Sequence, residues 1–238
     1  MAGTLFVGTS GFAYREWKPE FYPAALKNAE MLSFYSSHFS SVEINNTFYR
    51  APTEKMLKSW VEQTPESFRF TLKAPQRITH FAGLRDAEES VEYFLRTARA
   101  LGDRLGCILF QCPPSLRYER RLLADFLALL PGEPFRFAME FRHPSWDDAE
   151  VREALAANNT ALCVADTGTA TPSVVRTAQG FMYMRLRGLD YSDEDLRAWS
   201  TPVRAALEEG ADVYVYFKHE DDPSGVRFAL RFRDLVAG

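Results

Sequence analysis

The pattern of hydrophobic and polar positions along the chain predicts short strands that alternate with helices. In the segment 68–73, for example, phenylalanine, phenylalanine and leucine alternate with arginine, threonine and lysine. A period of two puts the apolar side chains on one face of a strand and the polar side chains on the other. Alternation of this kind, or a short apolar run bounded by turn residues, marks eight expected strands: 5–10, 41–45, 68–73, 107–111, 135–141, 160–166, 181–187 and 212–218.

Apolar residues at helical spacing follow seven of these eight segments. They predict helices over 26–39, 53–63, 91–101, 118–130, 145–157, 192–209 and 223–236. Thr53, Ser145 and Ser192 are suited to cap three of these helices at their N-termini. The interval 167–180 contains Pro172 and little helical periodicity, so we expect a loop or a single turn there.

This order of elements predicts an α/β fold, a single (β/α)8 TIM barrel in which the helix after strand six is short or missing. No repeat, linker or low-complexity tract divides the chain, so we expect residues 1–238 to form one domain. A doubly wound open sheet is the competing architecture. Eight strands in so few residues favour closure, which also leaves no strand edge unpaired.

Polar side chains gather where the expected strands end, which in a barrel is the face that carries the functional site. A charged or polar residue occupies the last inward position of every strand: Ser10, Glu43, Lys73, Gln111, Glu140, Asp166, Arg185 and Lys218. Further candidates lie just past the strand ends: Asn45, Arg142, His143, Arg187 and His219. Ionisable groups crowded in one cleft mark function more often than structure. The alternative is an inert plug of salt bridges, because buried charges must be paired.

The charge balance of these residues indicates the kind of ligand. The whole chain has a net charge of −4, which does not point to nucleic acid, yet the strand ends carry more cations than carboxylates. We therefore expect a small anionic ligand that contains a phosphate or carboxylate group, and no cofactor. A divalent metal is the alternative, since three carboxylates and two histidines are suitable ligands. The chain lacks an HxH, HExxH or CxxC motif that would support a metal site.

The first hypothesis is an enzyme that uses general acid/base chemistry. Glu43 and Glu140 would transfer protons, with Lys73 and Arg142 positioning them, and His143 and Asp166 are further catalytic candidates. The anion would be held by Arg185, Arg187 and Lys218. We expect Glu140 to be ionised at neutral pH, with its pKa lowered by at least one of Lys73, Arg142 and Arg185. A non-catalytic binder of anions or nucleic acid remains an alternative.

Three further features leave alternatives open. The aromatic rings of the loop after the first strand, together with Tyr49 and Trp146, could stack a base or sugar, or could cap the barrel mouth. Cys112 could be a nucleophile, although a buried structural cysteine fits its apolar strand better. Three cysteines that cannot all pair predict a reducing, cytoplasmic setting. No apolar run approaches the roughly 20 residues that span a bilayer, so we expect no membrane association.

Several motifs combine into a resemblance that covers nearly the whole chain. They include Val7-Gly-Thr-Ser-Gly-Phe, Phe21-Tyr-Pro, Val42-Glu-Ile-Asn-Asn-Thr-Phe-Tyr-Arg, Ile78-Thr-His, Leu109-Phe-Gln-Cys-Pro-Pro, Glu140-Phe-Arg-His-Pro-Ser-Trp, Tyr183-Met-Arg-Leu-Arg-Gly and Tyr214-Val-Tyr-Phe. In these the chain resembles the family called domain of unknown function 72 (YecE-like). The resemblance implies a TIM barrel of the sort seen in endonuclease IV and sugar isomerases, and it implies no established reaction. By analogy with such barrels, a metal-dependent phosphodiester or nucleic-acid enzyme is the second hypothesis.

The chain departs from this family pattern at two places. Arg187 stands where the family commonly has histidine before a glycine, and Lys218-His219 stands where it often has an asparagine pair. A role that needs an imidazole at position 187 is therefore not available here. If catalysis requires a histidine, His80, His143 or His219 must supply it.

Overall fold

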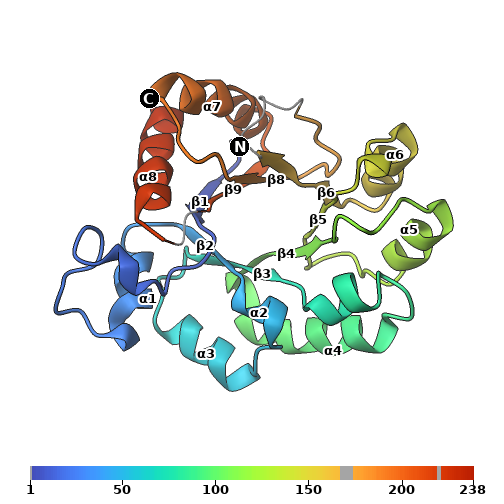
Figure 1. Ribbon diagram of the computed structural model, residues 1–238, viewed down its shortest axis with the longest axis horizontal. Helices are drawn as coiled ribbons and strands as arrows, with labels where there is room; N and C mark the ends of the chain where they lie inside the picture. The colour runs from blue at the N-terminus through green and yellow to red at the C-terminus, as the bar shows by residue number, and fades with distance from the viewer. Residues whose placement is uncertain (1, 167–173, 219–220) are drawn as a thin grey trace.

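Two parallel sheets curve around a shared interior, and the helices lie outside them (Figure 1). The computed structural model describes residues 2–166, 174–218 and 221–238. Its strands are β1 (Leu5–Thr9), β2 (Ser41–Ile44), β3 (Arg69–Lys73), β4 (Leu105–Gln111), β5 (Phe137–Glu140), β6 (Ala161–Leu162), β7 (Val164–Asp166), β8 (Phe181–Leu186) and β9 (Asp212–Phe217). One sheet has the order β1-β9-β8-β7 and the other has the order β2-β3-β4-β5-β6. An α/β fold with parallel strands is thus confirmed.

The expectation of one continuous eight-stranded sheet needs correction, because the strand ladder is divided at two places. The first division falls within the segment expected as strand six. Ala161 and Leu162 pair with β5, whereas Val164–Asp166 pairs with β8. The amide of Cys163 still donates to the carbonyl of Met139 on β5 (2.9 Å). The chain therefore changes partner immediately after Cys163, and a single expected strand becomes β6 and β7.

The second division lies between β1 and β2, where side chains replace most of the ladder. A single parallel bridge joins Ser10 to Glu43. The hydroxyl of Tyr35 accepts a hydrogen bond from the amide of Thr9 (2.8 Å). A Cβ atom at Gly8 would lie 1.9 Å from a carbonyl oxygen of β2. Only glycine permits this close approach, so the two sheets touch at this seam although few backbone groups pair across it.

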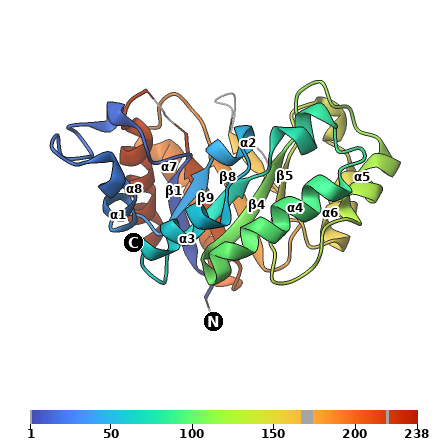
Figure 2. The ribbon, with the colours of Figure 1, turned by 90° about the horizontal axis from the view of Figure 1, so that it is seen from below.

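The helices cover the outer faces of both sheets (Figures 1 and 2). They are α1 (Met31–Ser36), α2 (Asn46–Tyr49), α3 (Glu54–Glu62), α4 (Glu88–Ala98), α5 (Arg120–Leu127), α6 (Ala149–Ala157), α7 (Asp193–Glu208) and α8 (Ser224–Ala237). Short helical turns occupy Arg15–Trp17, Asn28–Glu30, Arg77–Phe81, Arg99–Arg104 and Pro144–Trp146. Residues 174–180 contain no helix, as expected for that part of the interval after strand six, and 167–173 lie outside the described residues. None of the helices in the described ranges is long and apolar enough to cross a membrane.

Two of the three expected helix caps are confirmed. The side chain of Thr53 accepts from the amide of Met56 at the start of α3, and Ser192 caps α7. The cap expected at Ser145 is wrong, because α6 begins at Ala149 and Asp148 caps it. The Ser145 hydroxyl instead accepts from the amide of Tyr118 (2.8 Å) in the preceding loop. The Ser145 oxygen that was expected to cap the helix therefore makes a tertiary contact instead.

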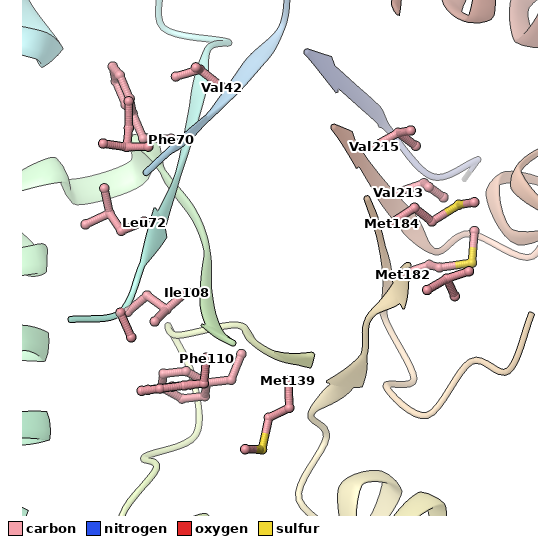
Figure 3. Packing of buried hydrophobic residues seen from close by; sticks show 14 of the residues in the cluster. Val42, Phe70, Leu72, Ile108, Phe110, Met139, Met182, Met184, Val213 and Val215 are labelled. Atoms are coloured by element: carbon pink, nitrogen blue, oxygen red, sulfur yellow. The ribbon is translucent and has the colours of Figure 1, made fainter. Parts of the chain in front are cut away.

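The alternation of side chains along the strands sorts the core into two layers. Figure 3 shows that labelled side chains of β3 and β4 and those of β8 and β9 point in opposite directions, each set toward its own helices. These apolar residues belong to the larger core cluster, between sheet and helices. A smaller cluster lines the interior and includes Cys107, Leu109, Ala138, Tyr183 and Tyr214. The inward positions expected along these strands are confirmed, and they place the next polar residues at the interior's C-terminal end.

Candidate functional site

A buried network of ion pairs lies at the C-terminal ends of β2, β5 and β8. Arg185 donates from Nη2 to Oε1 of Glu43 and from Nη1 to Oε2 of Glu140, each at 2.6 Å. The side chains of all three residues are at most 3% exposed. Arg187 is the fourth member, and its Nη2 lies 2.7 Å from both carboxylate oxygens of Glu140. We call these four residues the ion network. Its two carboxylates are joined through a guanidinium, as buried charges require.

Glu140 accepts hydrogen bonds from four different side chains. Besides Arg185 and Arg187, it accepts from Nε of Arg142 (3.1 Å) and from Nε2 of Gln111 (2.9 Å). Burial by itself would raise the pKa of Glu140. The charges of Arg185 and Arg187 and the hydrogen bond from Gln111 outweigh burial and hold the pKa well below its usual range. The expectation of an ionised Glu140 held by nearby cations is confirmed, and a carboxylate so stabilised is a weak base.

Glu43 is fully buried and equally committed to its partners. The hydroxyls of Ser10 and Tyr183 donate to it at 2.7 and 2.5 Å. Burial favours the neutral acid, but Arg185 and these two hydroxyls lower the pKa of Glu43 below its usual value. Glu43 is therefore also ionised, and its contacts indicate no role beyond holding the ion network together.

Sequence reasoning missed two buried tyrosines of the interior, of which Tyr183 bonds to the ion network. Tyr183 reaches Glu43, and the hydroxyl of Tyr216 lies 2.6 Å from that of Ser41 and 2.8 Å from that of Thr71. Burial raises the pKa of both phenols, so they stay neutral donors. The period-two alternation could have identified Tyr183, since it stands two residues before Arg185 and faces the same side of the strand.

Lys73, at the end of β3, is the buried cation of the site that lacks a carboxylate partner. Its Nζ lies 3.9 Å from the centroid of the Phe48 ring, and the residue is 9% exposed. In the described ranges Nζ makes no hydrogen bond or ion pair. Burial, reinforced by the charge of Arg185 and partly offset by Glu43, lowers the pKa of Lys73 to about 8. This amine can exchange a proton close to neutral pH.

His80 and Arg142 join Lys73 in what we call the basic cluster. Burial and the positive charges of Lys73 and Arg142 lower the pKa of His80. The His80 ring also packs edge-on against Phe48, with centroids 4.8 Å apart. Arg142 uses its Nε for Glu140, and its side chain is 37% exposed. Lys73, His80 and Arg142 thus form a positively charged group, while the nearby carboxylates of Glu43 and Glu140 are already bound to arginines.

Replacing Lys73 with methionine should stabilise the protein by about 1–3 kcal/mol near neutral pH, because a partly desolvated charge without an ion-pair partner is removed and methionine packs well on an aromatic ring. Urea unfolding is the measurement. Wild-type stability should rise relative to the variant as pH increases from about 8 to about 10. In that window the unfolded chain keeps the Lys73 proton that the folded protein has lost. A variant that is less stable than wild type would contradict an unpaired Lys73, and Lys58→Met, an exposed site, is the control.

The structure does not bring every expected residue to this site. The inward position of Asp166 is wrong, because the inward side chains near it are Cys163 and Ala165. Asp166 instead accepts a hydrogen bond from the Tyr191 hydroxyl (2.5 Å), which also accepts from the amide of Gly188 (2.7 Å). Leu162 and Val164 pack in the core cluster between sheet and helices, and Asp166 falls on the same face of the strand.

Three other expected residues lie at the margin of the site. Asn45 is half-buried and its carbonyl accepts from the amide of Phe48 (3.0 Å). Lys218 is exposed just beyond β9. Nδ1 of His143 accepts from the amide of Ser145 (3.1 Å), which leaves the other ring nitrogen for a proton. His219 lies outside the described residues.

A pocket of about 640 Å³ opens beside the site where β7 has parted from β5. Arg142 and His143 line it together with Cys163 and Ala165. Arg142 thus adjoins a space large enough for a small ligand.

For most rings of the aromatic loop and for Cys112, the structure fits a structural role rather than ligand binding or catalysis. Trp17 and Tyr22 are fully buried, and Trp146 stacks on Phe141 with ring centroids 3.9 Å apart. Tyr49 remains exposed. Cys112 is buried, and burial raises the pKa of its thiol well above the usual value. A buried structural cysteine is therefore the interpretation that fits.

The residues considered as metal ligands do not converge. Within residues 2–166, 174–218 and 221–238, no three His, Cys, Asp or Glu side chains form a group that could hold a metal ion. Arg185 stands between Glu43 and Glu140, and Asp166 lies on the other face of its strand. Guanidinium and ammonium groups outnumber carboxylates among the side chains of the ion network and the basic cluster.

Together, the parallel sheets and the charged strand ends define an α/β protein with a basic site at the C-terminal end of its strands. Residues 6–238 match the family model described as "Protein of unknown function DUF72", and the chain belongs to this family.

Relatives and solved structures agree with this assignment. The chain is 39% identical over 116 residues to the UPF0759 protein YecE of Escherichia coli K12, covering 48% of this chain and 42% of that protein. It is 29% identical over 150 residues to the UPF0759 protein YunF of Bacillus subtilis, covering 60% of this chain and 52% of that protein. The chain thus spans about half the length of the curated relatives it matches.

Two crystal structures of DUF72 family proteins share the fold along nearly the whole chain. The one from Thermotoga maritima has a TM-score of 0.86 and 28% identity, covering 99% of this chain and 100% of that one. The one from Enterococcus faecalis has a TM-score of 0.82 and 19% identity, covering 99% and 96%. The second likeness shows the fold alone.

Proposed function

We propose that this protein is an enzyme that acts on a small anionic ligand, phosphorylated or carboxylated, bound at the C-terminal ends of the strands. The observation that carries the proposal is the basic cluster of Lys73, His80 and Arg142. Burial, together with the positive charge of Arg142, lowers the pKa of both Lys73 and His80, and Lys73 forms no ion pair with a carboxylate in the described residues. An incoming anion would relieve this repulsion and would satisfy the donors at once.

The ion network and the basic cluster would have different roles. Glu43 and Glu140 are held as carboxylates by several donors each, so they suit positioning better than the proton transfer expected from the sequence. Lys73, with a pKa near 8, suits proton transfer at neutral pH. Arg142 would bind the anion, because its guanidinium is partly exposed and adjoins the pocket.

We also infer that the two sheets together form one (β/α)8 barrel in a single domain. In this interpretation β6 and β7 are halves of the sixth strand, and the bridge from Ser10 to Glu43 closes the ring between β1 and β2. The Ser10 side chain supports closure, because it donates to Glu43 across that seam. The site would then lie where barrel enzymes carry their chemistry.

Sulfate binding, measured by isothermal titration calorimetry, tests the proposed function. Sulfate keeps its charge across the pH range, so the protein alone sets any pH dependence. Binding should weaken about tenfold between about pH 7 and about pH 9.5, because Lys73 loses its proton and one charge-assisted hydrogen bond is lost. The pKa of about 8 sets the window.

The variants separate a specific site from general charge. Lys73→Met should bind sulfate weakly at both pH values, and Lys58→Met, which removes an exposed lysine, should behave as wild type. Equal sulfate affinity in wild type and Lys73→Met would overturn the proposed function.

A further inference from the structure

The surroundings of the Lys73 amine suit a nucleophile better than a fixed cation. Most of the Lys73 side chain is buried, and Nζ faces the Phe48 ring without a hydrogen-bonded acceptor among the described residues. Arg185 and Arg142 add positive charge beside it. A lysine that is desolvated or placed next to other cations is the kind that reacts with carbonyl groups as a free amine. The lowered pKa of about 8 agrees with this geometry.

The groups around Lys73 also restrict which carbonyl compound would fit. Arg142 gives its Nε to Glu140, and in the part of the chain that the structure describes its two terminal nitrogens make no hydrogen bond or ion pair. His80 holds its Nδ1 against the Thr79 hydroxyl (2.9 Å), so its other nitrogen is left for a ligand. These donors would face an anionic group near the carbonyl.

We propose that Lys73 forms an imine with the carbonyl carbon of a small aldehyde or ketone whose phosphate or carboxylate group is held by Arg142 and His80. This proposal rests on the proposed function, since it takes the same site and names its substrate class. Phosphorylated aldehydes or ketones and 2-oxo acids have the required combination of groups.

The step balances without an oxidant or reductant. The Nζ lone pair forms a bond to the carbonyl carbon while the carbonyl π electrons move to oxygen, which takes up a proton. The nitrogen of this carbinolamine loses one proton, and the protonated hydroxyl leaves as water while the C=N bond forms. The amine, the carbonyl compound and one proton thus give a protonated imine and one water molecule. A protonated imine then withdraws electrons from the neighbouring carbon, which is the purpose of such intermediates.

Reductive trapping tests the imine directly. The chain of 238 residues is incubated near neutral pH with limiting glycolaldehyde phosphate and sodium cyanoborohydride, and modified lysines are located by peptide mass mapping. Unphosphorylated glycolaldehyde is the matched probe without the anion, and glyoxylate is the matched carboxylate. Lys73 should be labelled roughly tenfold faster than the other five lysines. Sulfate should protect it from the anionic probes.

Two variants make failure of the imine distinct from failure of the anion site. Lys73→Arg keeps the charge but cannot form an imine, so it should still bind sulfate while all labelling at position 73 is lost. Wild type that binds sulfate but is labelled equally on all lysines would overturn the imine and leave the anion site standing. Wild type that neither binds sulfate nor labels at Lys73 would overturn both. Equal rates with glycolaldehyde and its phosphate would overturn the assigned substrate class.

Discussion

Replacing Arg185 with methionine should lower the free energy of unfolding by about 3–5 kcal/mol, the largest loss expected for any single change in the site. Arg185 bonds to Glu43 and Glu140 at 2.6 Å, and its removal would leave two buried carboxylates without their shared partner. Methionine fills much of the same space, so the loss reports on charge more than on volume. Urea unfolding at neutral pH is the measurement.

The matched control for Arg185 is Arg231, which pairs with Asp193 on the surface. Both side chains of that pair are 47% exposed, and such pairs contribute at most about 1 kcal/mol. Arg231→Met should therefore have little effect. If Arg185→Met cost no more than Arg231→Met, the ion network would not hold this end of the protein together.

Replacing Glu140 with glutamine should cost about 2–3 kcal/mol near neutral pH, since hydrogen bonds to charged groups contribute about that much. The change keeps the shape of the side chain but removes the charge that three arginines face. Urea unfolding is again the measurement. Glu119→Gln, at an exposed pair with Arg85, should change stability by less than about 1 kcal/mol.

The pH dependence of this loss has a definite sign. Because the pKa of Glu140 is lower in the folded protein than in the unfolded chain, its carboxylate stabilises the fold above the unfolded pKa. That stabilisation is lost as pH falls below about 4.5. The difference between wild type and Glu140→Gln should therefore be largest near neutral pH and shrink in acid. A difference that stays constant between about pH 7 and about pH 3 would contradict the lowered pKa.

Much of the fold follows from local pattern, and the places where the pattern failed have physical reasons. Period-two alternation found the strands and their inward faces because a buried sheet must sort apolar from polar side chains. It could not reveal that the chain changes pairing partner after Cys163, since pairing depends on neighbouring strands. The expectation of an undivided sheet failed there and at the seam between β1 and β2, whereas Asp166 was assigned to the wrong face of its strand. Ser145 failed as a cap for a similar reason, because a residue from another loop takes its hydroxyl.

The candidate site was predicted in its composition but not in its organisation. Inward parity identified Glu43, Glu140 and Arg185 together, and the structure joins them in one network. Sequence alone could not tell which cations would be paired. Arg185 and Arg187 were expected to bind the anion, yet both are paired with carboxylates. Among the described residues of the site, Lys73 is the buried cation without a carboxylate partner. Which charge meets which is decided by distances across strands that are far apart in the chain.

The most direct test of the basic cluster is a crystal structure of the protein grown with selenate, an analogue of sulfate that anomalous scattering can locate. We expect a selenate ion within hydrogen-bond distance of Lys73 Nζ and the Arg142 guanidinium, with Arg185 still bound to Glu43 and Glu140. A map without selenate there, and with Lys73 paired to Glu43 or Glu140 instead, would contradict an anion site at the ends of these strands.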